Sequence, residues 1–510
     1  MKLHRLYLVL LLLLVSLTAA AEDVVVRQGC RRGTPRPQGM MLRRGASGGQ
    51  TKQVGGDFYH GERHQLTVLV AFNDRSFKGD EAATVTQWNK IFNVKGLSEA
   101  PFKGSVRDYF YAQSYDDFDL TFDLVYVKVK GNAVKYASDA NTDENSQYLV
   151  QDIMEELLKR GIDWSLYDWN GDGFVNQLLI VYAGHGMNDY AGSDLIWPHQ
   201  WWMSEHLKDR QPGVYCDPIP VTYSDKEYKV DCYCALAELT KNNDYGSFGT
   251  ICHEYTHCFG FPDFYFGSSS YVGSWELMDN GNYNGSGYRP AGYSAHERWM
   301  MGWLTPTELT TATTITNMSA LNDVPQAYLI RNDGHQDEYY IVENRQQEGW
   351  DSALPSSGII VVHIDYDATI WTSVLEPPNH PNFTDDEGNY HSAQQRYLIF
   401  PANNYSTTYN SRNWPYPYNG NNELTNTSTP AATLWNLNKD SSKLMSKPLT
   451  NMAVIGEAAS FDFMGGATAI APVFTSATED SNDTYNLQGQ RVGSTYHGLV
   501  IVNGKKYLKK

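Results

Sequence analysis

The residues best suited to chemistry in this chain of 510 residues lie in the segment HEYTHCFGFPD, which begins at position 253. His253 and His257 are four residues apart, so on a helix both imidazoles lie on one face and can bind the same metal ion. Glu254 is one step round from that face, where its carboxylate can reach a water molecule without binding the ion itself. Two imidazoles and one further protein ligand leave the fourth position of a zinc ion open, which is the arrangement that a zinc hydrolase needs.

The residues after the second histidine offer a third ligand. Gly260 can adopt the left-handed conformation that ends a helix, and Pro262 keeps the helix from resuming. The chain can then double back and bring the carboxylate of Asp263 to the ion. Two later carboxylates, Glu276 and Asp279, remain alternatives. Glu276 has the spacing of the second-helix glutamate of thermolysin-like enzymes, but it lies in a stretch rich in Gly, Ser and Asn that predicts no helix.

Two further segments strengthen this interpretation, GSWELMDNG (273–281) and PAGYSAHERWMMGWL (290–304). Together with HEYTHCFGFPD they resemble the immune inhibitor A type of secreted zinc metallopeptidase, the M6 family, and the resemblance extends over residues 63–305. It implies an endopeptidase made with a signal peptide and a pro-segment, in which His253, His257 and Asp263 bind zinc and Glu254 is the general base. Met278 would form a hydrophobic floor beneath the histidines, as the methionine of the Met-turn does in metzincin peptidases.

Hydrophobic periodicity indicates the elements that position these residues. Apolar, β-branched runs at 65–72, 120–129 and 178–182 predict strands, and a 3.6-residue apolar period over 145–160 predicts an amphipathic helix. Ser105 is a candidate N-cap for another helix. We expect a metzincin-like, two-lobed zinc peptidase domain in which an edge strand pairs with an extended protein or peptide substrate.

The composition changes after residue 306, where short alternating runs such as 338–343 and 358–364 predict strands. We therefore expect an all-β, sandwich-like domain over 306–465, and the whole fold class to be α+β. Residues 466–510 read as a linker and a short β tail. This tail resembles the C-terminal sorting tails of secreted or surface proteins of some Gram-negative bacteria, and a plain terminal hairpin is the alternative.

The first 21 residues have the pattern of a secretory signal peptide. Lys2 and Arg5 precede an apolar run, and Ala19-Ala20-Ala21 offers a cleavage site. The run is short for a membrane span, and no later stretch has the length of a transmembrane segment. We expect a secreted, extracellular protein, attached to the cell surface if the C-terminal tail acts as a sorting signal.

Residues 22–62 are rich in Gly, Pro and Arg and read as a pro-segment. Its dibasic pairs, Arg31-Arg32 and Arg43-Arg44, are sites where an activating trypsin-like protease could cut. Cys30 offers a thiolate that could cap the zinc and keep the zymogen latent. Since no established switch motif surrounds it, an ordinary structural cysteine is the favoured alternative.

The segment DWNGDG has the spacing of the first half of a calcium loop, with Asp168, Asn170 and Asp172 as oxygen ligands. Position twelve of that loop is Leu179 instead of a bidentate glutamate, which excludes a complete EF-hand. Two interpretations remain, a partial Ca²⁺ site completed by other residues and an Asx-rich turn without an ion.

A formal net charge of −18 argues against nucleic acid as a partner. The chain is rich in tyrosine (35) and tryptophan (13), as exported proteins that bind or cut polymers often are. The sequence therefore predicts a secreted zinc endopeptidase that hydrolyses extracellular proteins. The competing class is a non-enzymatic, adhesin-like surface protein with a structural zinc site, and a metalloenzyme acting on another bond is a third interpretation.

Overall fold

The computed structural model describes residues 57–137, 145–188, 195–208, 211, 214–246, 248–371, 378–384, 390–391, 393–466 and parts of 484–509. Two compact units divide the chain, residues 1–466 and 467–510. The predictions for the signal peptide, the dibasic pairs and Cys30 lie outside the described residues. Within those residues, the fold combines several β-sheets with a small number of helices, and the region after residue 306 is rich in strands.

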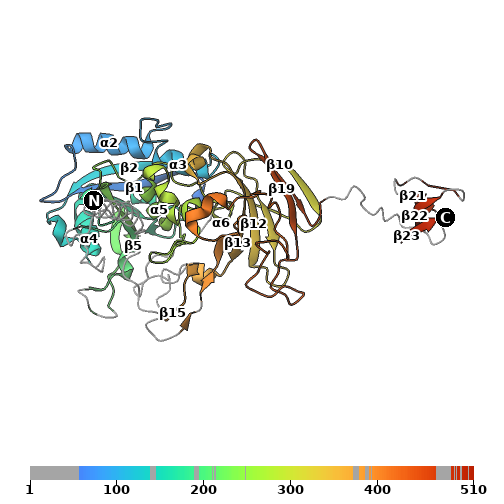
Figure 1. The fold of residues 1–510 in the computed structure, drawn as a ribbon. Coiled ribbons are helices and arrows are strands. Elements are labelled where there is room, and N and C mark those ends of the chain that lie inside the picture. Colours follow the sequence, from blue (N-terminus) through green and yellow to red (C-terminus); the bar gives the residue numbers. More distant parts are fainter. Residues whose placement is uncertain are drawn as a thin grey trace, which may run out of the picture. The chain divides into compact units, whose positions relative to one another are not determined.

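A five-stranded sheet in the order β2-β1-β4-β8-β5 forms the scaffold of the first half of the larger unit (Figure 1). Four strands are parallel, whereas β5 runs antiparallel to β8 at one edge. Its inner strands are continuous apolar runs because helices and loops cover both faces. The strands are β1 (Gly61–Ala71), β2 (Phe118–Lys128), β4 (Leu178–His185), β5 (His199–Trp202) and β8 (Cys232–Leu239).

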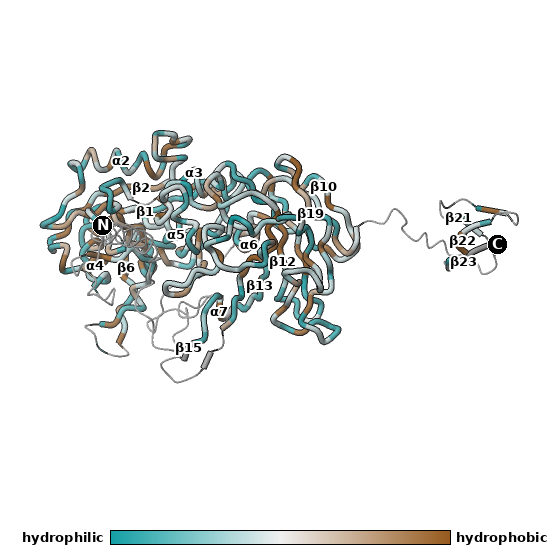
Figure 2. Tube along the Cα trace, in the orientation of Figure 1, coloured by the Kyte–Doolittle hydropathy of each residue, from teal (hydrophilic) through white to brown (hydrophobic). Residues whose placement is uncertain are grey.

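Four helices accompany this sheet: α2 (Glu81–Asn93), α3 (Val106–Gln113), α4 (Ser146–Leu157) and α5 (Phe248–Cys258). Helix α2 lies over β2, and its hydrophobic and hydrophilic residues alternate along the tube (Figures 1 and 2). Helix α3 begins with a complete capping box, because the hydroxyl of Ser105 accepts the N–H of Asp108 and the carboxylate of Asp108 accepts the N–H of Ser105. The predicted helices at 105–111 and 145–160 and the three predicted strands are thus present with shifted ends.

Two sheets follow in the β-rich region. The larger has the order β18-β13-β12-β11-β9, and the smaller has the order β10-β20-β19. The larger sheet consists of β9 (Thr307–Glu308), β11 (Tyr328–Arg331), β12 (Glu338–Arg345), β13 (Gly358–Asp365) and β18 (Tyr397–Ile399). The smaller consists of β10 (Thr313–Met318), β19 (Leu449–Ile455) and β20 (Ala458–Phe463).

Both faces of β12 and β13 are buried, since every residue of these strands is inaccessible to solvent. Successive side chains of a strand point to opposite faces. One set, including Tyr340 and Val342, belongs to a hydrophobic cluster shared with β10, β19 and β20. The alternate set, including Tyr339 and Ile341, belongs to the cluster that fills the first half of the unit. The larger sheet therefore joins the two hydrophobic clusters.

Shorter elements connect these layers. Two of them are the helices α6 (Ala295–Met300) and α7 (Ala368–Trp371). The small strands are β3 (Phe174–Val175), β6 (Ile219–Tyr223), β7 (Lys226–Val230), β14 (Asn379–His380), β15 (Phe383–Thr384), β16 (Tyr390–His391) and β17 (Gln394–Gln395). The 3-10 turns are η1 (Asp57–Tyr59), η2 (Ala133–Lys135), η3 (Trp164–Tyr167), η4 (Met203–Glu205), η6 (Gly273–Trp275), η7 (Asn280–Gly287), η8 (Gly349–Ala353) and η9 (Thr408–Asn413).

The smaller unit contains a three-stranded antiparallel sheet of β21 (Thr484–Asn486), β22 (Gly498–Val502) and β23 (Lys505–Lys509). Among the helices of the described residues, none has both the length and the apolar character needed to cross a bilayer.

Candidate metal centre

Helix α5 carries the two histidines of the sequence motif, and all eleven of its residues are buried. It packs closely against η7. A Cβ atom at Gly249 would lie 1.8 Å from the backbone oxygen of Asn282, so only glycine fits at this point of the helix. The position of α5 is therefore set by its contact with the segment that follows the predicted Met-turn.

The structure brings His253, His257 and Asp263 together. The Nε2 atom of each histidine lies 3.1 Å from Oδ1 of Asp263. The three side chains are buried, and one potential ligand atom from each lies within 4.8 Å of the other two. Gly260 produces the reversal that brings Asp263 back, because it has φ +96° and its N–H donates to the oxygen of His257 at 2.9 Å.

Backbone oxygens orient both imidazole rings. Nδ1 of His253 lies 2.8 Å from the oxygen of Leu277, and Nδ1 of His257 lies 2.7 Å from the oxygen of Phe261. A carbonyl can only accept, so each Nδ1 must carry the proton and donate it. In the neutral imidazole that binds a metal, each Nε2 then presents its lone pair towards the cluster, which is the orientation that a metal ligand requires; without an ion, a proton on Nε2 of His253 can take that place.

The electrostatics of the cluster are those of a cation site. Burial lowers the pKa of His253, but its hydrogen bond to Asp263 and the charges of Glu254 and Asp263 outweigh this effect and raise the pKa to about 9. Two nitrogen lone pairs and a carboxylate oxygen that converge in a buried space repel one another unless a positive charge lies between them. The donor set, two imidazoles and one carboxylate, is one that zinc accepts.

Glu254 lies beside this cluster. Its side chain is buried on α5, next in the chain to His253, and its negative charge helps to raise the pKa of that histidine. By contrast, burial raises the pKa of the Cys252 thiol well above its usual value. A protonated thiol is a poor metal ligand, so Cys252 is not expected to join the three converging side chains.

The segment 276–279 contacts the cluster through its backbone. Leu277 supplies the carbonyl for His253, and the oxygen of Met278 accepts the N–H of Phe264 at 2.8 Å. Met278 is fully buried, and its predicted place beneath the histidines stays a prediction. Asp279 is occupied elsewhere, because its Oδ2 accepts three consecutive backbone N–H groups of residues 271–273.

Glu276, the alternative third ligand, is not one of the three converging side chains and has other acidic groups near it. Burial and the neighbouring Glu297 raise its pKa well above the usual range, and the pKa of Glu297 rises to about 7 for the same first reason, burial. The two carboxyl groups are close enough for each to affect the pKa of the other. Glu276 therefore holds a proton more readily than an ordinary glutamate, which disfavours it as a metal ligand.

The calcium motif forms a compact turn before β3. Asp168 Oδ2 accepts the N–H of Gly173 at 3.2 Å, and Asp172 Oδ2 accepts the amide of Asn170 at 2.9 Å. The ammonium group of Lys226 lies 3.6 Å from Asp168 Oδ2 and supplies a positive charge there. These contacts agree with an Asx-rich turn, and a Ca²⁺ ion at this loop stays a prediction.

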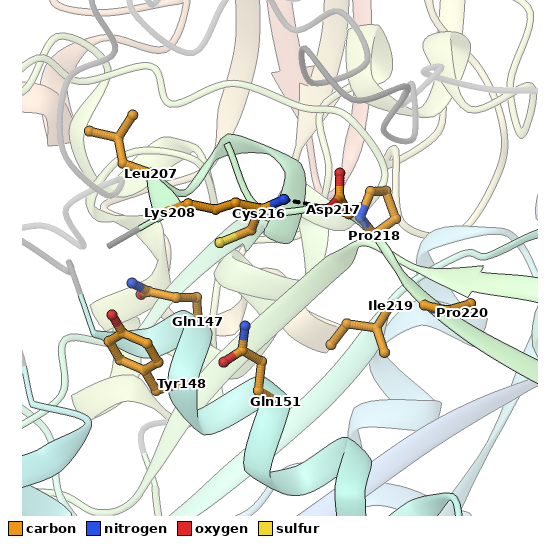
Figure 3. A pocket seen from close by; sticks show the side chains of 10 residues that line it. All are labelled: Gln147, Tyr148, Gln151, Leu207, Lys208, Cys216, Asp217, Pro218, Ile219 and Pro220. Carbon is orange, nitrogen blue, oxygen red and sulfur yellow. Dashed lines mark hydrogen bonds and ion pairs between the residues drawn. The ribbon is translucent and has the colours of Figure 1, made fainter. Parts of the chain in front are cut away.

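A pocket of about 380 Å³ lies between α4 and the loop before β6 (Figure 3). An ion pair between Lys208 and Asp217, 2.6 Å apart, forms part of its lining. Its other lining residues are Gln147, Tyr148, Gln151, Leu207, Cys216, Pro218, Ile219 and Pro220. His253, His257 and Asp263 are not among the residues that line it.

The backbone carbonyls of Leu277 and Phe261 are the parts of the centre that sequence reasoning missed. A carbonyl leaves no residue-type signal, because every residue has one. The sequence gives an indirect indication of the Leu277 carbonyl alone. Leu277 lies within the GSWELMDNG segment, whose turn residues allow the backbone to approach the helix closely.

Comparison with known proteins identifies a family. Residues 66–304 match the family model of the immune inhibitor A peptidase M6, catalytic domain. No individual curated protein matches the chain. The matched range contains α5, the reversal at Gly260 and the turn at 276–279.

Proposed function

Because residues 66–304 belong to the immune inhibitor A peptidase M6 family, whose members are peptidases, we propose that this protein is an exported, zinc-dependent endopeptidase. The observation that carries the proposal is the convergence of two Nε2 atoms on one carboxylate oxygen, each at 3.1 Å, in a buried site. In this proposal His253, His257 and Asp263 hold the zinc ion. Asp263 is preferred to Glu276, since Asp263 converges with the two histidines whereas Glu276 accepts a hydrogen bond from Tyr397 and has a raised pKa because of burial.

Several residues of the chain would have separate roles in the hydrolysis of a peptide bond. When bound, zinc would act as a Lewis acid that makes water a nucleophile at neutral pH and polarises a peptide carbonyl. The carboxylate of Glu254 would take a proton from the attacking water and pass it to the leaving amine. Leu277 and Phe261, through their carbonyls, would hold the imidazoles in the tautomer that binds metal.

The metzincin-like part of the proposal concerns the surroundings of the ion. Met278 is proposed to lie beneath the histidines, in the turn that orients His253. Strand β5 is proposed to bind the substrate, because it is the antiparallel edge of the main sheet and lies near α5. An extended peptide could add to this edge through main-chain hydrogen bonds, which would suit an endopeptidase that accepts many sequences.

The rest of the chain would serve export and latency. We propose that residues 1–21 direct secretion, that residues 22–62 are a pro-segment cut at its dibasic pairs, and that residues 466–510 act as a sorting tail. The β-rich region over 306–465 is proposed to be sandwich-like, since β10, β19 and β20 share a hydrophobic cluster with one face of the larger sheet.

The competing adhesin-like protein would use zinc only for structure. Structural zinc sites are usually closed by four protein ligands. Among the described residues three ligand candidates converge, and the acidic side chain next to them is Glu254, which such a site would not require.

Glu254→Gln tests the proposal, because it removes the base and keeps the size of the side chain. We expect the matured, zinc-loaded variant to bind zinc as the wild type does and to hydrolyse casein at least about a thousandfold more slowly. The matched control is Glu308→Gln, which changes a partly exposed glutamate of the β-rich region. Equal hydrolysis of casein by the Glu254→Gln variant and the wild type would refute the enzyme assignment.

A further inference from the structure

The two backbone segments that support the metal centre both contact one strand of the β-rich region, β18. The first is the turn at 276–278, whose Leu277 oxygen orients His253. The second is the segment immediately after Asp263. These segments are also joined to each other, because the N–H of Phe264 donates to the oxygen of Met278.

Tyr397 of β18 holds the first segment. Its hydroxyl donates to Oε1 of Glu276 at 2.9 Å, and both side chains are fully buried. Glu276 directly precedes Leu277, so the hydroxyl of Tyr397 restrains the residue before the one whose carbonyl receives the Nδ1–H of His253. The connection consists of the hydrogen bond to Glu276, the Glu276 side chain, the peptide bond to Leu277 and the hydrogen bond from His253.

Tyr397 and Asn379 also hold the second segment. The rings of Phe264 and Tyr397 stack, with centroids 4.1 Å apart and planes 8° from parallel. The amide of Asn379 donates to the oxygen of Phe264 at 3.1 Å and to the oxygen of Tyr397 at 2.7 Å, and its own oxygen accepts the N–H of Tyr397. The residue after Asp263 is thus fixed both through its ring and through its carbonyl.

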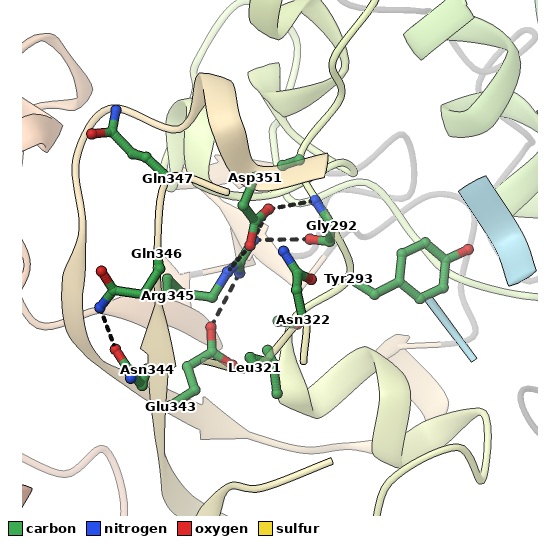
Figure 4. Close-up of polar contacts among 12 residues, drawn as sticks. Gly292, Tyr293, Leu321, Asn322, Glu343, Asn344, Arg345, Gln346, Gln347 and Asp351 are labelled. Carbon is green, nitrogen blue, oxygen red and sulfur yellow. Dashed lines mark hydrogen bonds and ion pairs between the residues drawn. The ribbon is translucent and has the colours of Figure 1, made fainter. Parts of the chain in front are cut away.

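A second set of contacts connects the same sheet to helix α5. Arg345 of β12 donates to both oxygens of Asp351, to Glu343 and to the oxygen of Gly292 (Figure 4). The next residue, Tyr293, has its hydroxyl 2.6 Å from that of Thr256, which lies on α5 between the histidines. The β-rich region therefore supports the helix as well as the two segments.

We propose that Tyr397 and Asn379, contributed by the β-rich region, are positioning residues of the metal centre. They hold the Leu277 carbonyl and the Asp263 carboxylate at the separation that lets both histidines and the aspartate meet one ion. This inference rests on the proposed zinc site and adds that the family's matched range, 66–304, does not contain the whole support of that site. Neither residue touches the ion or the substrate in this assignment.

Tyr397→Phe in the full-length protein is the central test, since it deletes one hydroxyl and keeps the ring that stacks on Phe264. The matched control is Tyr340→Phe, because Tyr340 is a buried tyrosine of the same sheet whose hydroxyl donates to the oxygen of Thr433 at 2.6 Å, in the cluster away from the metal centre. Zinc affinity is measured by competition with a chelator, and the visible spectrum is recorded after substitution with Co²⁺.

We expect Tyr397→Phe to weaken zinc binding about tenfold, the lower end of what loss of an outer partner of a metal ligand costs, and to change the Co²⁺ spectrum. Tyr340→Phe should lower the melting temperature about as much as Tyr397→Phe does. It should leave the zinc affinity and the Co²⁺ spectrum unchanged. Asn379→Ala removes the hydrogen bonds of the Asn379 amide to Phe264 and Tyr397, and so tests the support of the second segment independently. It is the deciding variant for the inference if Tyr397→Phe does not fold.

Wild-type zinc affinity and an unchanged Co²⁺ spectrum in both Tyr397→Phe and Asn379→Ala would overturn the inference, as would an equal loss in Tyr340→Phe. These results differ from failure of the proposed function itself. In that case the wild-type protein would bind no stoichiometric zinc, and no variant could be compared with it.

Discussion

The tautomers of His253 and His257 are set by the backbone, and this decides what the two side chains can do. With each Nδ1–H donated to a carbonyl, both Nε2 atoms lie at the carboxylate of Asp263 and offer lone pairs to an ion when the imidazoles are neutral. Such a geometry is unfavourable for three hydrogen-bond acceptors alone and favourable for a bound cation. The chemistry of the site therefore depends on the turn and on the reversal at Gly260 as much as on the histidines.

The two candidates for the third ligand, Asp263 and Glu276, lead to opposite predictions for zinc binding. We expect Asp263→Asn to weaken zinc binding by more than about a hundredfold, because it removes the charged ligand itself, whereas Glu276→Gln should weaken it by no more than about tenfold. Equilibrium dialysis with quantification of zinc measures both. The reverse order, with the larger loss in Glu276→Gln, would assign the ligand to Glu276.

The sequence predicted the three converging side chains but not the residues that support them. Spacing within one helix and a nearby glycine are local features, and local features are readable from sequence. Tyr397 contacts Glu276 across 121 positions of the chain, in a strand of three residues that shows no alternating apolar pattern. Such a contact depends on how the sheets and helices pack together, which no local sequence pattern predicts.

At the scale of elements, the N-cap of α3, the helix at 146–157 and the strands β1, β2, β4, β12 and β13 were predictable because each carries its own cap, apolar run or period. Strand β5 was not, since HQWW is short, is buried throughout and has no alternation. Its antiparallel direction, which matters for the proposed substrate site, follows only from its pairing with β8.

The close contact between α5 and η7 gives an element-scale prediction. Gly249→Ala would place a methyl group 1.8 Å from the oxygen of Asn282, so α5 must shift. We expect a loss of about 1–3 kcal/mol in the free energy of unfolding, typical of overpacking, together with weaker zinc binding. Gly493→Ala is the control, because its added Cβ meets no atom within 4 Å. Denaturant unfolding that shows no difference between the two variants would contradict the packing described.

The β-rich region contains a buried carboxylate, that of Glu338, which predicts a dependence of stability on pH. Burial raises the pKa of Glu338, but the hydrogen bond from His363 at 2.7 Å, the backbone N–H of Trp435 and the amide of Asn332 lower it, to about 2 overall. Because the pKa in the folded state lies below the ordinary glutamate value of 4.5, its contribution to stability is present above pH 4.5 and is lost as the pH falls towards 2.

Glu338→Gln should therefore cost about 1–3 kcal/mol at pH 7, since buried donors lose their charged partner, and the cost should shrink below pH 4.5. The control is Glu308→Gln, whose carboxylate is 43% exposed and pairs with Arg331 at 3.3 Å, an exposed type of ion pair that contributes little. Urea titrations between pH 3 and 7 measure both. A cost that stays constant over this range would show that the charge of Glu338 contributes nothing.

At the scale of the whole molecule, the larger unit has a continuous interior. The main hydrophobic cluster includes residues of the matched peptidase range and residues of β11, β12, β13 and β18. Members of the smaller unit occur in neither hydrophobic cluster among the described residues. The change of composition near residue 306 therefore marks a change of architecture without a break in the core.

This continuity predicts the outcome of two truncations. A chain that ends at Gly466 should keep the peptidase activity and the unfolding transition of the full-length protein. A chain that ends at residue 305 loses the strands that cover the main cluster and the segments next to the metal centre, so we expect it to be insoluble or unfolded. Circular dichroism and casein hydrolysis distinguish these results, and a soluble, active chain ending at residue 305 would contradict the shared core.

X-ray absorption at the zinc edge of the purified wild-type protein tests the central claim most directly, because it reports the atoms bound to the ion. We predict one zinc per chain, bound by two imidazole nitrogens and one carboxylate oxygen, with a further oxygen from solvent, all at about 2.0–2.2 Å. Scattering from sulfur at about 2.3 Å, a shell closed by four protein side chains, or the absence of stoichiometric zinc would contradict the account.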